Sequence, residues 1–470
     1  MPAKLFPRHA FALASLMLAT AVQAAFTTEI VYFDMPENLE RQVNPTPTAA
    51  LAALPGYPNN PNQLTLAAQI YVPDVNVFSG PYPTVIILHG SGGMWSNDVI
   101  ANGPLSHLEQ WGELLADMGY IALLVDSYNP RGIPGNYSSR RPSYDPAVDD
   151  DVCSPNYERP KDVVAALSYL ADRSDVDVDN IGLMGFSHGA QTGMNAVLDV
   201  SVDLINYEVS YIDYDSDDEE EFTTTKAVDS PVRIPDSLPF PKFGAFYYGG
   251  GSHYGYHGQA SSVTAGRYML DRRMQVLAFH GTEDSLLGVS NPNVLPMTGT
   301  LFPIKQLLSS SLQAQTEGVD DPLQHHYIMD LVEHSFDLAS LAAEIDWNTN
   351  NEDADQKAKR LCREEVLKWL EYCLKAGPST AVEPQPSPGM VDLVASTNAR
   401  LNYQWLYSDD LSVWNELDSD FDGDDNDITI GTPLGQDDRR FFSLQYLPIE
   451  PPFDDPDNAG FFFDYTDFSY

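Results

Sequence analysis

A serine between two glycines is the first residue of this sequence with the features of a nucleophile. Residues 185–189 read Gly-Phe-Ser-His-Gly, with Ser187 at the centre. An apolar run at 181–184 precedes the pattern and small, helix-compatible residues follow it, which predicts a strand, a sharp turn and a helix. Side chains at the two glycine positions would collide where strand and helix pass closely, and the strained turn exposes the serine hydroxyl. We therefore predict that Ser187 is a catalytic nucleophile.

A serine nucleophile needs a general base and an acid that orients the base. The apolar run 275–280 leads to Asp284, and a further strand-like run at 327–329 precedes His334. We predict Asp284 as the acid and His334 as the base. Rivals for these roles are Glu283 and Glu333 as acids and His325 and His326 as bases. The two rival histidines fall within or before the predicted strand, whereas the base belongs on the loop that follows it.

The same chemistry requires backbone donors for the oxyanion of the tetrahedral intermediate. The apolar run 83–88 ends in His-Gly-Ser-Gly-Gly at residues 89–93. A loop in this position supplies one N–H, and the residue after the nucleophile supplies the other. We predict an oxyanion hole formed by the N–H of Gly92, or of its neighbour Ser91, together with the N–H of His188.

These side chains must be positioned by strands and helices that alternate along the chain. The continuous apolar runs are typical of buried parallel strands, and residues 105–117 and 353–374 have the apolar spacing of helices. The order Ser187, Asp284, His334 is that of the α/β-hydrolase fold. The sequence thus predicts an α/β protein with a mostly parallel sheet flanked by helices, followed by a small β-rich module at the C-terminus.

Several segments, in this order, resemble the dienelactone hydrolase-like branch of the α/β-hydrolase superfamily. The segments are residues 89–93, 126–132, 159–167, 185–189, 243–249, 281–284 and 334–336. Together they span roughly residues 60–375, and the resemblance implies a hydrolase. Dienelactone hydrolases themselves carry cysteine as nucleophile. Ser187 instead resembles the secreted serine esterases of the broader family, which leaves open whether dienelactone itself is a substrate.

Three residues are candidates for substrate binding. Tyr128 and Arg131 follow a buried strand at the carboxyl end of the predicted sheet, where ligands bind in open α/β folds. Arg131 is placed to hold a substrate carboxylate, and the alternative is a structural ion pair with Asp126 or a helix end. His253 lies in a loop rich in glycine and aromatic residues at the same end of the sheet, and is expected to line the pocket.

The chain divides into four parts. Residues 1–24 have the charged start, apolar core and small residues of a secretory signal peptide, with cleavage expected after Ala24. Residues 25–376 form the hydrolase domain, with an acidic insertion at about 203–241. The proline-rich segment 377–389 is predicted as a linker, and residues 390–470 as the β-rich module, which resembles one appended to exported bacterial proteins. We expect an exported protein, periplasmic or secreted, without stable membrane insertion after signal cleavage.

The formal net charge is −43. It argues against nucleic acids and anionic membrane surfaces as partners, because no basic stripe offsets phosphate repulsion. Only three cysteines occur. Cys362 and Cys373 lie about 16 Å apart on a predicted helix at roughly 1.5 Å per residue, too far for a disulfide. A disulfide from Cys153 to either of them stays open.

An aspartate-rich segment in the C-terminal module is spaced like the first part of a calcium loop. The candidate ligands are Asp418, Asp420, Asp422 and Asp424. Alternating oxygen ligands of this kind wrap a hard cation. The twelfth position is Thr429 rather than glutamate, so the bidentate ligand of such a loop is missing. A structural Ca²⁺ in this module is the one cofactor that the sequence suggests, and none is expected for catalysis.

The predicted function is a serine hydrolase that cleaves carboxylic esters, either small molecules or polymers. Hydrolysis of amides or peptides on the same triad is one alternative, because the triad logic is shared. The other is a surface- or carbohydrate-binding protein whose hydrolase domain is non-catalytic. The complete triad with both glycine-containing loops argues against the latter, since a retired site would not need all of these residues.

Overall fold

The computed structural model covers most of the hydrolase domain and the strands of the C-terminal module. The residues that it describes are 26–39, 46–58, 60–133, 135, 153, 155, 158–197, 207–214, 220–228, 232–248, 274–281, 283–284, 324–329, 331–339, 353–375, 380–384, 390–396, 401–408, 415–416, 421–422, 427–433, 441–448 and 462–463.

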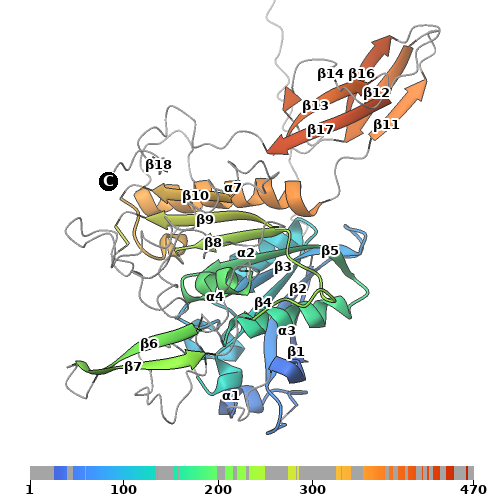
Figure 1. Cartoon of the computed structure of the whole chain (residues 1–470). Helices are drawn as coiled ribbons and strands as arrows, with labels where there is room; N and C mark the ends of the chain where they lie inside the picture. The colour runs from blue at the N-terminus through green and yellow to red at the C-terminus, as the bar shows by residue number, and fades with distance from the viewer. Residues whose placement is uncertain are drawn as a thin grey trace, which may run out of the picture.

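The hydrolase domain is built on one nine-stranded sheet with the order β1-β2-β4-β3-β5-β8-β9-β10-β18 (Figure 1). The strands are β1 (Phe26–Asp34), β2 (Thr65–Pro73), β3 (Tyr82–Leu88), β4 (Ile121–Asp126), β5 (Val176–Phe186), β8 (Phe243–Tyr247), β9 (Gln275–Gly281), β10 (Gln324–Met329) and β18 (Phe462–Phe463). Neighbouring strands run parallel from β4 through β10, and β1, β2 and β18 pair antiparallel. In the sheet β4 lies between β2 and β3, out of sequence order. This strand order confirms the predicted α/β-hydrolase fold.

Helices cover both faces of the sheet, as Figure 1 shows. They are α1 (Ala49–Ala52), α2 (Ser106–Asp117), α3 (Pro160–Ala171), α4 (His188–Ala196) and α7 (Ala354–Leu374), with short 3-10 turns η1 (Glu37–Leu39), η2 (Ser96–Asp98), η3 (Ile100–Asn102), η4 (Asn129–Arg131) and η7 (Phe336–Leu338). Side chains of α2 and α7 share one core with one face of the sheet, and those of α3 and α4 share the second core with the other face.

The alternation of side chains along β3 explains why residues 85–88 are all apolar. Val85 and Ile87 point into the core under α2 and α7, whereas Ile86 and Leu88 point into the core under α3 and α4. A strand covered on both faces has no exposed position for a polar residue.

Helix α7 begins with a capping box, in which the Asp353 side chain accepts from the Gln356 N–H and the Gln356 side chain accepts from the Asp353 N–H.

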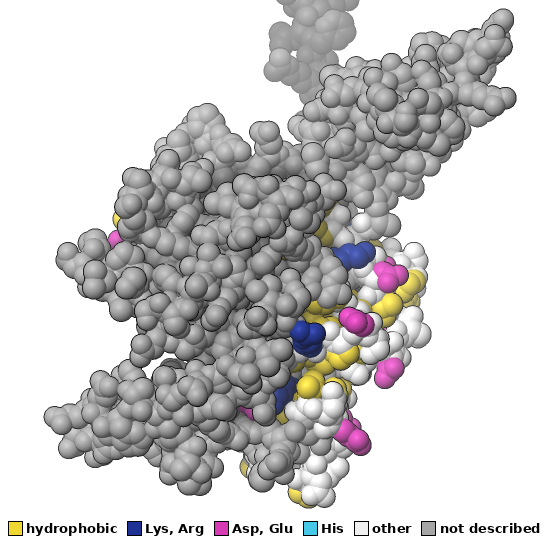
Figure 2. All heavy atoms as spheres, in the orientation of Figure 1, with side chains coloured by type: hydrophobic (Ala, Val, Ile, Leu, Met, Phe, Trp, Pro, Cys, Tyr) yellow, Lys and Arg dark blue, Asp and Glu magenta, His cyan; other side chains and the backbone are white. Residues whose placement is uncertain are grey.

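The acidic insertion contains an antiparallel hairpin of β6 (Tyr207–Tyr214) and β7 (Glu220–Val228). The acidic residues Asp213 and Glu220 lie near its turn, opposite Phe222 and Tyr214 respectively. In the described part of the face drawn in Figure 2, Lys and Arg side chains lie singly among Asp and Glu side chains.

The C-terminal module consists of short antiparallel strands in two further sheets. They are β11 (Thr380–Pro384), β12 (Met390–Ser396), β13 (Leu401–Ser408), β14 (Asn415–Glu416), β15 (Phe421–Asp422), β16 (Asp427–Pro433) and β17 (Phe441–Pro448). Two details differ from the expected boundaries. Strand β11 lies inside the segment predicted as a linker. Its one proline, Pro384, is tolerated because β11 is an edge strand, which pairs with β12 alone among the described strands. Strand β18, near the C-terminus, pairs with β10 of the hydrolase sheet.

No helix in the described ranges is long and apolar enough to cross a membrane. The predicted signal peptide at residues 1–24 lies outside these ranges.

Candidate active site

The turn between β5 and α4 holds Ser187 in a backbone conformation that non-glycine residues rarely adopt. Its φ is 50° and its ψ is −115°. The Ser187 N–H donates to the carbonyl of Tyr247 at 2.9 Å, which fixes the turn against the end of β8. Strain at a single residue persists only where surrounding structure over-determines it, and such residues cluster at functional sites. The geometry is that of the predicted nucleophile elbow.

The two glycines of the elbow are required by space. A Cβ on Gly185 would overlap the backbone of Gly189 and Ala190, which belong to the first turn of α4. A Cβ on Gly189 would overlap the carbonyl of Leu88 at the end of β3. Because backbone atoms cannot move aside, neither position accepts a side chain without displacing Ser187.

Ser187, His334 and Asp284 form a continuous hydrogen-bonded chain. The distance from His334 Nε2 to Ser187 Oγ is 3.0 Å, and that from His334 Nδ1 to Asp284 Oδ2 is 2.7 Å. The Asp284 side chain is fully buried, whereas the His334 side chain is 12% exposed and therefore open to a substrate. An acceptor carboxylate on Nδ1 places the Nδ1 proton there and leaves Nε2 free to accept the serine proton.

The rivals for these positions lie elsewhere. Glu283 and Glu333 are exposed, whereas His334 Nδ1 pairs with the buried Asp284. His325 and His326 lie within β10, whereas His334 lies on the loop that follows that strand. The structure thus brings together the three residues favoured by the sequence. Their role in catalysis stays a prediction.

The predicted oxyanion loop lies directly against the elbow. A Cβ built on Gly90 would be 3.2 Å from the Phe186 carbonyl oxygen and 3.5 Å from Ser187 Cβ. Among the described residues, no acceptor receives the backbone N–H of Ser91 or of Gly92. Gly92 is exposed. These N–H groups are therefore free to serve a substrate oxygen beside the nucleophile.

A buried carboxylate anchors the far end of this loop. Asp126, at the end of β4, accepts from Trp95 Nε1 at 2.6 Å, from the Tyr128 and Asn129 N–H groups at 3.0 and 3.1 Å, and from Asn129 Nδ2 at 2.9 Å. Burial raises the pKa of Asp126, and these four donors oppose the rise by stabilising the carboxylate. The carboxylate joins the loop after β3 to the loop after β4.

A buried arginine sets the protonation of two histidines beside the nucleophile. Arg159 Nη1 lies 2.5 Å from His188 Nδ1, and Arg159 Nη2 donates to the His89 carbonyl at 2.9 Å. A guanidinium only donates, so His188 Nδ1 is an acceptor and the His188 proton is on Nε2. His89 Nδ1 donates to the Gly90 carbonyl while its Nε2 accepts the Ser127 N–H. Burial and the Arg159 charge hold the pKa of His89 well below its usual range, so His89 is neutral.

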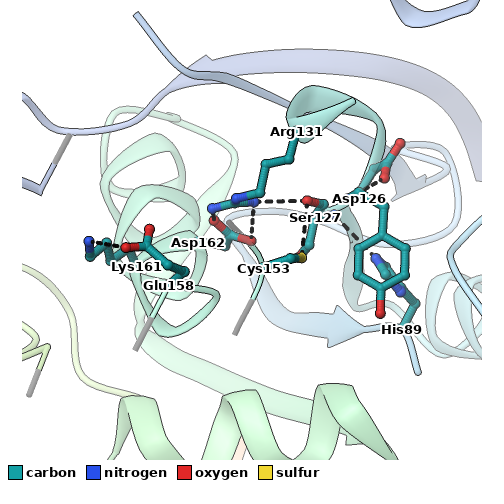
Figure 3. Close-up of polar contacts among 9 residues, drawn as sticks. His89, Asp126, Ser127, Arg131, Cys153, Glu158, Lys161 and Asp162 are labelled. Atoms are coloured by element: carbon teal, nitrogen blue, oxygen red, sulfur yellow. Dashed lines mark hydrogen bonds and ion pairs between the residues drawn. The ribbon is translucent and has the colours of Figure 1, made fainter. Parts of the chain in front are cut away.

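The predicted substrate role of Arg131 is wrong. Arg131 forms a bidentate ion pair with Asp162 at 2.6 and 3.0 Å and also donates to the Ser127 carbonyl, as Figure 3 shows. The Arg131 and Asp162 side chains have no exposed area. The pair joins η4 to the first turn of α3, so the alternative of a structural ion pair at a helix end is the one observed, with Asp162 rather than Asp126 as the partner.

Tyr128 lies in the wall behind the site and has almost no exposed surface. Its ring contacts His89 edge to face at 4.4 Å and lies 5.4 Å from the Arg159 guanidinium. Its position supports the residues around the nucleophile, and no open surface is left for a substrate to reach. His253 lies outside the described residues, so its predicted role is not placed.

The metal and disulfide predictions have different outcomes. Asp418, Asp420 and Asp424 lie outside the described residues, and Asp422 is the second residue of β15. Within the described ranges no cluster of metal-ligating side chains occurs, and the calcium prediction stays a prediction. The three cysteines form no disulfide. Cys153 Sγ instead lies 3.7 Å from the Ser127 carbonyl oxygen (Figure 3).

Sequence reasoning assigned no role in the site to three residues that complete it. They are Arg159, Tyr248 and Asp337. Tyr248 lies beside His334 with ring centroids 4.5 Å apart, and its hydroxyl donates to Asp337. The sequence next to these residues does not indicate such contacts, because each contact partner is distant in the chain.

Parts of this chain are similar to known proteins. The dienelactone hydrolase family model matches residues 66–234. No curated protein matches the chain. Similar solved structures include a dienelactone hydrolase-like promiscuous phosphotriesterase from metagenomic libraries, which is 14% identical, covers 74% of this chain and 99% of its own, and has a TM-score of 0.39.

Two further similar structures are an esterase and a peptidase. The propionate-bound esterase of Thermogutta terrifontis is 14% identical, with 66% of this chain and 92% of that chain covered and a TM-score of 0.35. Dipeptidyl peptidase 4 of Porphyromonas gingivalis is 15% identical, with 58% of this chain but only 31% of that chain covered and a TM-score of 0.33.

Proposed function

We propose that this chain is a serine hydrolase that cleaves carboxylic esters and that it belongs to the dienelactone hydrolase family of α/β-hydrolases, whose family model matches residues 66–234. The observation that carries the proposal is the hydrogen-bonded chain from Asp284 through His334 to Ser187, with Ser187 on a strained turn at the carboxyl end of the sheet. Side chains in this order and geometry activate a serine hydroxyl for acyl transfer.

In the acylation step, Ser187 Oγ attacks the ester carbonyl carbon while His334 Nε2 takes the hydroxyl proton. Asp284 holds the Nδ1 proton and stabilises the imidazolium that forms. The same proton then passes from His334 Nε2 to the leaving alkoxide, which departs as an alcohol and leaves the acyl group on Ser187. In deacylation a water molecule replaces the alcohol, with His334 again acting first as base and then as acid.

The negative charge of each tetrahedral intermediate develops on the former carbonyl oxygen. In this proposal the His188 N–H at the start of α4 and the N–H of Gly92 or Ser91 bind that oxygen. Both come from backbone that is fixed before the reaction, so no reorganisation is needed when the charge appears. The start of a helix adds a favourable partial positive charge.

The test is hydrolysis of short-chain nitrophenyl esters by the wild-type protein and by Ser187→Ala. We expect kcat to fall by about 10⁴-fold or more in the variant, since nucleophile and base act as a unit. The matched control is Ser106→Ala, which removes an exposed serine hydroxyl that accepts a hydrogen bond from Gln110. Equal activity in all three proteins would reject Ser187 as the nucleophile. Activity on nitroanilides alone, lost in Ser187→Ala, would replace the ester by an amide as the substrate.

We also propose that the protein is exported with cleavage after Ala24, on the strength of the signal-like composition of residues 1–24. Mass spectrometry of the protein recovered from periplasm and from culture medium tests this. A mature chain that begins at Ala25 is the expected result, and an intact Met1 start in the cell interior would contradict it.

A further inference from the structure

The phenol ring of Tyr248 packs against the imidazole of the predicted base. The ring centroids of Tyr248 and His334 lie 4.5 Å apart, with 58° between the ring planes. Tyr248 is the first residue after β8 and is 2% exposed. Since Nδ1 and Nε2 of His334 are already engaged with Asp284 and Ser187, the Tyr248 ring supplies a further contact of the imidazole that does not depend on hydrogen bonding.

Tyr248 is itself held in an unusual conformation. Its φ is 42°, in a region that aromatic residues rarely occupy. Its N–H donates to the Phe279 carbonyl at 2.7 Å, and its ring meets that of Phe336 edge to face at 5.6 Å. A strained residue is maintained only where such contacts over-determine it. The strain at Tyr248 therefore indicates a role for its side chain at this place.

The Tyr248 hydroxyl is anchored by a buried carboxylate. It donates a hydrogen bond to Oδ1 of Asp337, which is 3% exposed and lies on η7, three residues after His334. Burial and the Asp337 charge hold the pKa of Tyr248 well above its usual value, so the phenol stays protonated and remains a donor. The contact ties the loop after β8 to the loop after β10, which carries the base.

Other elements surround the Asp337 carboxylate. His107 of α2 places Nε2 at 3.8 Å from Asp337 Oδ2, and Lys359 and Arg363 of α7 interact with the same charge. Burial lowers the pKa of His107, which favours its neutral form. Asp337 is thus surrounded by groups from two helices, and these restrict the direction in which it can turn.

We propose that Tyr248 is a positioning residue, which holds the His334 ring in the one orientation that reaches Asp284 and Ser187 together, and that Asp337 fixes Tyr248 in place. This inference rests on the proposed function. An imidazole attached through two rotatable bonds has several staggered and flipped orientations, and only one serves both neighbours. A ring packed against it excludes the others, which lowers the entropy lost on reaching the transition state.

The first experiment compares kcat and KM for nitrophenyl ester hydrolysis in two variants. Tyr248→Leu removes the ring, and we expect kcat to fall about 10- to 100-fold, the scale of a misplaced catalytic group, with KM changed by less than about threefold. Tyr248→Phe keeps the ring and loses only the bond to Asp337, so it is expected to retain at least a third of the wild-type kcat.

The matched control is Tyr247→Leu. The Tyr247 ring packs on Phe186, Phe279 and Phe336 in the same aromatic cluster, so its loss also disturbs the core. We expect it to lower the melting temperature as much as Tyr248→Leu does, with a smaller loss of kcat. Equal losses of kcat in the two Leu variants would show a general packing effect and overturn the proposal.

A second readout needs no substrate and so separates this proposal from the function. The proton between His334 Nδ1 and Asp284 gives a downfield NMR resonance that is assigned by its absence in His334→Ala. We expect the resonance in the wild type, in Tyr248→Phe and in Tyr247→Leu, and its loss or broadening in Tyr248→Leu. Its persistence in folded Tyr248→Leu would overturn the positioning role even if the protein hydrolysed no ester. Failure of the ester assay alone would contradict only the proposed function.

Discussion

His188 and His334, the histidines on the two sides of Ser187, have charged hydrogen-bond partners of opposite sign. On the side of the predicted oxyanion hole, the buried Arg159 donates to His188 Nδ1 and to the His89 carbonyl, both of which are uncharged acceptors. On the side of the base, the carboxylates of Asp284 and Asp337 are buried beside His334 and Tyr248.

The difference matches the charges of the proposed transition state. Acyl transfer creates an oxyanion on one side of the serine and an imidazolium on the other. A buried cation whose hydrogen bonds within the described residues go to uncharged acceptors favours the first, and a buried carboxylate favours the second. Groups fixed in a low-dielectric site act strongly on such charges, because they need no reorganisation during the reaction. The polarity of the site is thus present before a substrate binds.

Asp284→Asn, on the side of the base, should have the largest effect on kcat. We expect kcat to fall by about 10³- to 10⁴-fold, because an amide no longer holds His334 in the required tautomer. The measurement is kcat for a nitrophenyl ester at pH 7.5 or above. Asp337→Asn is the matched control and keeps an acceptor for Tyr248. A loss as large as that of Asp284→Asn would give the two carboxylates the same role and remove the distinction between them.

Arg131→Met tests the other buried arginine, whose charge is paired with that of Asp162, for comparison with Arg159. It leaves Asp162 as a buried charge without its partner, so we expect a loss of about 3–5 kcal/mol in the free energy of unfolding, measured by urea denaturation. Activity per folded molecule should stay near that of the wild type. The double variant Arg131→Met with Asp162→Leu should recover most of the stability. A specific rise in KM for anionic esters, with stability unchanged, would restore Arg131 as a substrate ligand.

Arg159→Met should weaken the oxyanion side by a smaller factor. We expect a fall in kcat of about 10- to 100-fold, less than the loss from deleting a direct oxyanion donor, because Arg159 acts through His188 and His89. Burst titration of the active serine corrects for unfolded protein. An unchanged kcat in folded Arg159→Met would mean that the buried cation makes no contribution to the reaction.

The smallest expected effect is on the pH dependence of stability. The folded-state pKa of His89 lies well below its unfolded value of about 6.5. Below that pH the unfolded chain binds a proton that the folded chain does not, so His89 lowers stability as pH falls, by up to about 1.4 kcal/mol per pH unit. Urea denaturation at pH 7.5 and 5.5 should show a smaller loss in His89→Gln than in the wild type. The pKa of His107 is also lowered, so His107 changes stability with pH in the same direction, and it does so in both proteins.

The sequence by itself determined the class of fold, and it predicted the nucleophile and the order of the triad. Ser187 was recognisable because strand, turn and helix are adjacent in the chain and their steric demands are met by neighbouring glycines. His334 could be chosen over His325 and His326 because a base must follow the last strand, a rule that depends on local position alone.

Only the tertiary structure decided the surroundings of the triad. Arg159 meets His188 from 29 positions away, Arg131 meets Asp162 from 31, and Tyr248 meets Asp337 from 89. Neither residue of each pair has a local sequence feature that selects its partner, because the sheet brings the ends of separate strands to one edge. The physical reason is that a buried charge needs a partner, and the whole fold decides which residue packs beside it.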